Sequence, residues 1–439
     1  MDTINNCILL TIKVEYFLKT PIIEAINQLH KNINDINLML LGRTNPTYFT
    51  RKCKLDFKTL ILFMLNFITK SMQVEIDNFL ELLEGGVVTI TKQAISEARK
   101  KIKPETFVIL ANDITNLFYN KLNAFKTYKG YRVSAIDGSK LELNNSKRLR
   151  LGFGTSKNAT IEIAKAMASM LYDVENDYII ASKIDNVNSS ERNLAVQLIE
   201  QLKTFGQGKE LILFDRGYPS KDMISYLEGS NIKFLMRVSS SFVNEVNKAN
   251  QLDQIIEVKI NKRDYKLRVI RFILPSGIEE KLISNLTDVN EFTTEELKTL
   301  YFKRWGVETK YNELKNKLQI ENFTGDSVIT VEQDFYATVL ISNLLALSKA
   351  EANKVIKELN QEKVLKLEYK VNVNILISKL KNNLILAILE PDEEKRNLKI
   401  MRIIDKSSRY LVPVKKGRSF KRHKGLKENK FQLVQKRVL

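Results

Sequence analysis

The sequence contains few of the residues that usually carry nucleophilic or redox chemistry. Its 439 residues include two Cys, two His and one Trp. Cys7 and Cys53 are too few for a disulfide framework, and with only His30 and His423 there is no Cys/His cluster at zinc spacing. We therefore expect a reducing compartment and no structural zinc. Any catalysis must rest on carboxylates, lysines or a metal held by oxygen ligands.

Long apolar runs are missing as well. The longest, LILFMLNFI at 60–68, is too short to cross a bilayer, and the starting stretch MDTINN lacks a basic signal segment. We expect a cytoplasmic protein with no membrane partner. The 44% hydrophobic and 28% charged content is typical of a folded chain, and the length suits two or three domains or one core with a large insertion.

Positive charge is what the sequence has in excess. Seventy Lys and Arg stand against 51 Asp and Glu, a formal net charge of +19. Such a charge attracts polyanions, so nucleic acid is the leading partner class, with solvated lysine faces as the alternative. Residues 415–439 hold ten Lys or Arg and one acid. We expect this tail to contact DNA phosphates rather than to be a disordered, solvated end, with contacts from Lys415, Lys416 and Arg418.

The first 125 residues are predicted to be helical, because apolar residues recur at spacings of three and four and Gly and Pro are scarce. The last helix of this region begins after Thr91 and is expected to project Lys92, Gln93, Ser96, Arg99 and Lys100. This pattern resembles the recognition helix of a helix-turn-helix and predicts DNA contacts from Lys92 and Arg99. An ordinary amphipathic surface helix explains it equally well.

From residue 131 the pattern changes to alternating and β-branched runs. The strands YRVSAID, IEIAKAMASMLYDV and DYIIASKID are followed by a helix at 190–203, the strand ELILFD, a helix near 221–227 and the strand IKFLMRV. This order is found in ribonuclease-H-like folds, an α/β class with a mixed sheet flanked by helices. Further strands, IIEVKI, YKLRVIRFIL and EEKLISNL, precede a long helix that starts near Thr294.

These patterns divide the chain into four parts. Residues 1–125 are expected to form an N-terminal helical region that binds DNA, and residues 126–239 with 291–345 are expected to form a ribonuclease-H-like catalytic domain. Residues 240–290 are a β-rich insertion in that domain, and residues 346–439 are a C-terminal helical region with a basic tail.

Two aspartates are predicted to end neighbouring strands. Asp137 ends the first strand in SAIDGS and Asp215 the fourth in LFDRGYPS. In a ribonuclease-H-like topology both carboxylates emerge at the same edge of the sheet, which predicts a site for Mg²⁺ or Mn²⁺. Asp137 alone would commonly be a turn former, whereas the DRG context of Asp215 is more informative. Arg216 in that context is expected to contact DNA.

The stretch YFKRWGVETKYNELK, residues 301–315, aligns polar residues along one helix stripe. At about 100° per residue the stripe is roughly 60° wide and borders the buried face instead of opposing it. It consists of Tyr301, Arg304, Glu308 and Lys315. Glu308 is thus predicted to lie against the sheet edge as a third carboxylate. A surface helix with an i, i+4 ion pair explains Arg304 and Glu308 but not the rest of the stripe.

These motifs resemble those of the DDE transposases of bacterial insertion sequences, IS-four type. The family signature Y-x2-R-x3-E-x6-K is complete in the stripe, and DGS at Asp137 and DRGY at Asp215 match the contexts of its two catalytic aspartates. The β-rich segment also falls where that family carries an insertion. The resemblance covers residues 60–345, approximately, and its combined motifs are specific.

The resemblance implies a DNA transposase that uses two Mg²⁺ ions for in-line displacement at phosphorus, with Mn²⁺ as a substitute. Asp137 would bridge both ions, with Asp215 on one and Glu308 on the other. The partners implied are double-stranded DNA, namely the element's terminal inverted repeats and the target, to which the 3′ ends are joined. Arg304 and Lys315 would hold phosphates of the terminal strands, Tyr301 a phosphate near the cleaved end, and Trp305 would pack against a DNA end.

The resemblance also implies a homodimer in a synaptic complex and a bacterial, nucleoid-associated location. Members commonly cut through a hairpin intermediate, which requires a flipped base to stack on an aromatic. The insertion lacks the tryptophan that often serves this purpose, so Phe272 or Tyr265 would replace it. Two alternatives stay open: a transposase-derived DNA-binding protein without cleavage, and a structure-selective nuclease without strand transfer.

Overall fold

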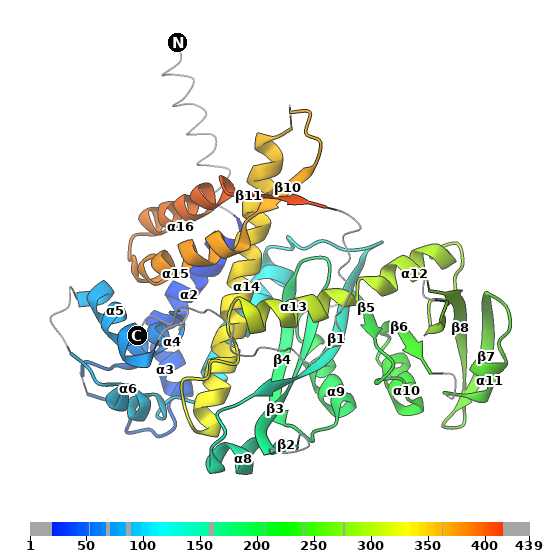
Figure 1. Cartoon of the computed structure of the whole chain (residues 1–439), viewed down its shortest axis with the longest axis horizontal. Helices are drawn as coiled ribbons and strands as arrows, with labels where there is room; N and C mark the ends of the chain where they lie inside the picture. The colour runs from blue at the N-terminus through cyan, green and yellow to red at the C-terminus, as the bar shows by residue number, and fades with distance from the viewer. Residues whose placement is uncertain are drawn as a thin grey trace, which may run out of the picture. The chain divides into compact units, whose positions relative to one another are not determined.

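The computed structural model describes residues 20–51, 53–66, 71–84, 89–157, 162–206, 208–239, 242–274, 277–361 and 363–415 (Figure 1). The chain divides into two compact units, Phe107–Asn343 and Met1–Thr106 with Leu344–Leu439. Two residues of the predicted DNA-binding tail, Lys416 and Arg418, lie outside the described residues. Among the described residues, no helix is long and apolar enough to cross a membrane.

A nine-stranded mixed sheet forms the centre of the first unit. Within it, β1 (Tyr131–Glu142) is antiparallel to β3 (Glu162–Asp173) and parallel to β5 (Lys209–Phe214). β5 is in turn parallel to β6 (Lys233–Val238). The apolar stretches of β1 and β5 are buried along their shared ladder, as expected for parallel strands covered on both faces.

The segment predicted as a β-rich insertion extends this same sheet. β9 (Glu279–Ser284) pairs antiparallel with β6, and β8 (Arg263–Ile273) and β7 (Asp253–Ile260) continue outward from it. At the other edge, β4 (Tyr178–Asn186) and the short β2 (Thr155–Lys157) both pair with β3. The three insertion strands are therefore continuous with the strands that carry the two aspartates.

Helices flank the sheet. α9 (Glu191–Leu202) contacts β1, β3 and β4, α10 (Lys221–Gly229) contacts β6, and α13 (Trp305–Asn316) contacts β1. Figure 1 shows α13, in yellow-green, crossing in front of these strands. Hydroxyls of Ser190 and Ser220 accept backbone hydrogen bonds and so start α9 and α10. The other described helices of this unit are α7 (Glu105–Asn116), the π-helix η1 (Leu117–Lys121), α8 (Lys147–Phe153) and α11 (Asn244–Lys248).

The long helix predicted from Thr294 is two helices. α12 (Thr294–Phe302) begins with a capping box between Thr293 and Glu296. At its end the amides of Arg304, Gly306 and Val307 bond to carbonyls three residues earlier, a tighter turn that interrupts the α-helix. Tyr301 therefore belongs to α12, Glu308 and Lys315 to α13, and Arg304 to the junction.

Helices from both ends of the chain build the second unit. α2 (Pro21–Asn34) packs on α15 (Val373–Leu389) and α16 (Glu393–Ser408), where His30 Nδ1 donates to the Ile388 carbonyl at 2.7 Å. Regions that the sequence analysis assigned to opposite ends thus form one body. The remaining elements are α3 (Ile36–Gly42), α4 (Phe57–Met64), α5 (Met72–Glu84), α6 (Lys92–Arg99), β10 (Glu368–Val371) and β11 (Leu411–Val414), with α14 (Val328–Leu359) divided between the units.

Candidate active site

Three parallel strands each present a charged residue at the same level. The ladders of β1, β5 and β6 end together, with the last paired residues being Ile136, Phe214 and Met236. Asp137, Asp215 and Arg237 come next, on strands spaced by about 4.8 Å. The two aspartates therefore share one sheet edge, as predicted. Asp137 does not end its strand, however, because β1 continues to Glu142 while pairing with β3 alone.

Asp215 is approached by two side chains. The Tyr301 hydroxyl lies 3.5 Å from Asp215 Oδ1, and Arg237 Nη1 lies 3.8 Å from the same oxygen. Arg237 also donates to Glu280 on β9, and the exposed Arg216 lies 3.6 Å from that glutamate. Tyr301 is buried, so in this structure its hydroxyl faces the carboxylate rather than the surface.

Arg304 lies buried among the carboxylates. Its side chain is 4% exposed and Nη2 donates to Glu308 Oε1 at 2.9 Å, while the Glu308 side chain is 39% exposed. Burial disfavours the charge on Arg304, but Tyr301, Asp215 and Glu308 together raise its pKa. The ion pair between Arg304 and Glu308 is therefore present. It differs from a solvated surface pair, because Arg304 is buried and its charge also interacts with Asp215.

The environment of Asp137 disfavours its charge. Burial raises the pKa of Asp137 from 3.8 to about 6. Arg304 and the Gly138 amide oppose this shift, and repulsion from Glu308 and Asp215 adds to it. Glu308 and Asp215 are thus close enough to Asp137 to raise its pKa, and Arg304 is close enough to oppose them.

Buried polar contacts fix α13 against the sheet. The Tyr311 hydroxyl donates to the carbonyls of Asp137 at 3.1 Å and Ala168 at 3.0 Å, which joins the helix to β1 and β3. The residue before Tyr311, buried Lys310, lies 2.7 Å from both Asp177 and Glu313. These contacts set the rotation of α13 and thereby the position of Glu308.

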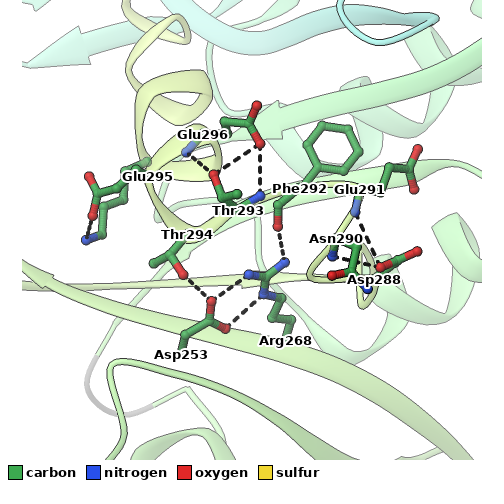
Figure 2. Close-up of polar contacts among 11 residues, drawn as sticks. Asp253, Arg268, Asp288, Asn290, Glu291, Phe292, Thr293, Thr294, Glu295 and Glu296 are labelled. Carbon is green, nitrogen blue, oxygen red and sulfur yellow. Dashed lines mark hydrogen bonds and ion pairs between the residues drawn. The ribbon is translucent and has the colours of Figure 1, made fainter.

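A buried ion pair holds the start of α12 (Figure 2). Arg268 on β8, 1% exposed, donates to Asp253 on β7 at 2.5 and 2.8 Å and to the Phe292 carbonyl at 2.6 Å. The hydroxyl of Thr294, the first residue of α12, also donates to Asp253. The insertion strands therefore anchor the helix that carries Tyr301.

The other residues predicted to contact DNA differ in their exposure and in the unit to which they belong. Trp305 is 55% exposed, and Lys315 Nζ donates to the Lys140 carbonyl at 2.8 Å, near Glu321. In the second unit, Lys92 on α6 and Lys415 are exposed. Arg99 is not available on that surface: at 1% exposure it is buried, since it lies on the same side of α6 as Ile95 and Ala98. The expectation that α6 projects Arg99 is corrected accordingly.

The carboxylates do not form a closed metal-binding group. Within the described residues, no three His, Cys, Asp or Glu side chains are grouped so that they could hold a metal ion. The chemistry nevertheless fits a hard divalent cation, because Asp137, Asp215 and Glu308 offer only carboxylate oxygens. Close by, the buried hydroxyl of Tyr218 has no hydrogen-bond partner.

Metal-free protein carrying Asp137→Asn is expected to be more stable than wild type above pH 6, by on the order of 2 kcal/mol. The folded pKa of about 6 exceeds the unfolded value of 3.8, so ionisation of Asp137 destabilises the folded chain. The difference should develop between pH 4 and 6, approximately, and disappear below that range. Urea unfolding with chelator across pH measures it, and equal stabilities at pH 7.5 would contradict this electrostatic description.

Sequence reasoning assigned no role to Arg237, Tyr311 or Tyr218. In IKFLMRV, Arg237 directly follows the apolar residues of its strand, as Asp137 and Asp215 do on the neighbouring parallel strands. This shared position could have identified Arg237 from the sequence. Tyr311 lies at the apolar spacing of its helix, and its hydroxyl bonds depend on tertiary packing.

Residues 128–344 match the family model of the transposase DDE domain. The chain is similar to the transposase InsG for insertion sequence element IS4 of Escherichia coli (strain K12), with 23% identity over 281 residues that cover 60% of this chain and 62% of that protein. It thus spans about three fifths of that relative.

Among solved structures, the chain is similar to a piggyBac transposase synaptic complex with hairpin DNA. The identity is 13% and the TM-score 0.44, over 90% of this chain and 84% of that one. The family match contains all three predicted carboxylates and the complete Tyr301-to-Lys315 signature. Residues 128–344 thus resemble the transposase DDE domain, and the similarity to the IS4-element transposase agrees with this resemblance.

Proposed function

We propose that the chain binds the terminal inverted repeats of its element, cleaves the DNA there and joins the 3′ ends to target DNA. The observation that carries this proposal is the convergence of Asp137, Asp215 and Glu308 on one edge of the sheet, inside the segment that matches the DDE domain. Cut-and-paste transposition requires both strand cleavage and joining. A single carboxylate cluster serves both, because both are displacements at phosphorus.

The topology supports a ribonuclease-H-like catalytic domain. The strands β4, β3, β1, β5 and β6 lie in this spatial order, with β3 antiparallel and β5 and β6 parallel to β1. We propose that the insertion strands serve this domain by holding α12, and that the second unit serves DNA binding and dimer formation. A homodimer follows from the need to cut two element ends together.

DDE transposase domains generally use divalent metal ions, and we propose Mg²⁺, with Mn²⁺ as a substitute. Asp137, Asp215 and Glu308 are the residues that would hold it. When bound, the cation activates the attacking water or 3′-hydroxyl and stabilises the leaving oxygen. The positive charge of Arg304 opposes the rise in the pKa of Asp137 that burial causes.

A basic hollow supports DNA binding by the second unit. It has a volume of about 300 Å³ and lies along α15 and α16. Its charged lining residues are all cations, namely Lys379, Lys399, Arg402 and Lys406. Lys399 is paired with Glu390 at 2.6 Å. We propose that phosphates of the DNA backbone occupy this hollow, since such contacts need positive charge and no base recognition.

Replacing Arg402 and Lys406 together by Ala is expected to weaken binding to any duplex. The slope of log K against log salt should become shallower by about 0.9 for each lost phosphate contact. Fluorescence anisotropy with inverted-repeat and unrelated duplexes at several salt concentrations measures both effects. The control is Arg409→Ala, also on the C-terminal side of α16 but paired with Asp405 at 2.7 Å. If the slope of log K against log salt is unchanged in the double variant, the hollow is not part of the DNA-binding surface.

If a hairpin intermediate forms, Phe272 is the better candidate to support the flipped base. Phe272 packs against Phe302 on α12, with ring centroids 6.0 Å apart, one residue beyond Tyr301. The Tyr265 hydroxyl is instead hydrogen-bonded to Ser225 on α10 at 3.0 Å. Exposed Trp305 is a further aromatic surface beside the site.

One assay tests the proposed function as a whole. Purified protein is incubated with labelled duplexes ending in the element's inverted repeats, with Mg²⁺ and target plasmid, and scored for nicks, hairpins and joined products. We expect cleavage and joining that require both the repeat sequence and the cation. Binding without cleavage under any divalent metal would favour the DNA-binding alternative, and cleavage without joining would favour the nuclease.

A further inference from the structure

A fourth carboxylate lies beside the two aspartates. Glu191, the first residue of α9, reaches across the backbone that follows each of them. A Cβ placed on Gly138 would lie 3.3 Å from the Glu191 carboxyl carbon, and one placed on Gly217 would lie 4.0 Å from its Oε2. Arg192 Nε fixes this end of α9 to the loop by donating to the Gly217 carbonyl at 3.0 Å.

The Tyr218 hydroxyl faces the same group of acids. The residue is 1% exposed, and its hydroxyl has no hydrogen-bond partner. Its ring packs near Phe214, and its amide donates to the Asp215 carbonyl at 3.2 Å, so the side chain is held in place. Burial raises the pKa of Tyr218, and Asp137, Glu191 and Asp215 add to that rise. A neutral donor is thus buried beside several acceptors without bonding to any of them.

We propose that Glu191 is a fourth carboxylate ligand group of the divalent-cation site, and that Tyr218 is a positioning residue that donates to an oxygen of this site when the cation is present. The inference rests on the proposed function, because it concerns the same cation. Glycine at position 138 leaves the space that the Glu191 carboxyl group occupies beside Asp137, whereas at Gly217 a Cβ would make only an ordinary contact. An exposed glutamate in a first helical turn would otherwise serve only the helix dipole of α9.

The first test measures Mn²⁺ affinity of the full chain, without DNA, from the electron paramagnetic resonance signal of free Mn²⁺. Glu191→Gln is expected to weaken binding by roughly tenfold, and Glu191→Asp less. Asp222→Asn is the matched control, because Asp222 is a first-turn acid of α10 that bonds to Asn261 at 3.3 Å. Wild-type affinity in Glu191→Gln would overturn the inference. Failure of the wild type itself to bind Mn²⁺ would overturn the proposed function and this inference together.

The second test uses Tyr218→Phe, which removes only the hydroxyl. Because that buried hydroxyl has no hydrogen-bond partner in the structure, the variant should unfold in chelator at the wild-type temperature or slightly above it. With Mn²⁺ present, its affinity should fall several-fold, and the stabilisation by Mn²⁺ should shrink. A purely structural tyrosine would give the opposite result, namely lower stability in chelator and unchanged Mn²⁺ affinity, and that result would overturn the role assigned to Tyr218.

Discussion

In the Asp137→Asn variant, DNA strand cleavage is expected to fall by roughly 10³-fold or more, while DNA binding stays at the wild-type level. Asp137 is central in the site, because Asp215, Glu308 and Arg304 all act on its protonation. Asn keeps the shape and an acceptor for the Gly138 amide but removes the charge, and several kcal/mol of transition-state stabilisation are lost with it. Single-turnover cleavage of labelled element ends measures the loss.

The control for this variant is its affinity for DNA, measured under conditions that do not support cleavage. Anisotropy with the same duplex in Ca²⁺ or chelator should give an affinity equal to wild type or slightly higher, since one negative charge near the phosphates is gone. Asp222→Asn, which lies on α10 and is tied to Asn261, should cleave at the wild-type rate. Loss of DNA binding by Asp137→Asn would show that the residue supports the fold or the interface instead.

The Asp253→Ala variant is expected to lose on the order of 3 kcal/mol of stability. It leaves the guanidinium of Arg268, 1% exposed, without its carboxylate, and removes the acceptor of the Thr294 hydroxyl (Figure 2). A buried charge without its partner is among the costliest single changes. The melting temperature should fall by roughly 10 °C, and cleavage should fall further than repeat binding, because α12 carries Tyr301.

Two further variants separate the buried charge from other effects. Asp253→Ala combined with Arg268→Met should recover much of the lost stability, since no unpaired charge remains. Glu295→Ala removes one partner of an exposed ion pair with Lys298 and should change stability by less than about 0.5 kcal/mol. If Asp253→Ala and Glu295→Ala have equal melting temperatures, the ion pair between Asp253 and Arg268 does not anchor α12.

The positions of the proposed catalytic side chains were predictable from sequence because these residues lie on regular elements. The ends of two apolar runs placed Asp137 and Asp215 at one edge of the sheet, although β1 continues beyond Asp137, and helical periodicity put Glu308 on the side of its helix that borders the core. The spacing of apolar residues along a strand or a helix is a local property, so it can be recognised in the sequence without knowledge of the tertiary fold. The family signature then added the roles that geometry alone does not assign.

Other features depend on contacts that one sequence does not reveal. The break between α12 and α13 follows from three tightened backbone bonds near Arg304, although the polar stripe runs through it unbroken. Arg99 is a charged residue yet is buried, because it lies on the side of α6 that also carries Ile95 and Ala98. Glu191 comes from a helix start distant in sequence from either aspartate, and only packing over Gly138 and Gly217 brings it to them.

The most direct test of the central claim is the metal requirement of Asp215→Cys in strand cleavage. A thiolate is a poor ligand for Mg²⁺ and a better one for the softer Mn²⁺. Replacing the Asp215 carboxylate by a thiolate should therefore change which cation supports cleavage. The account predicts that wild type cleaves element ends with either cation, whereas Asp215→Cys cleaves measurably only with Mn²⁺. Cleavage by Asp215→Cys at the wild-type rate in Mg²⁺ would contradict the assignment of this carboxylate, and with it the active site described above.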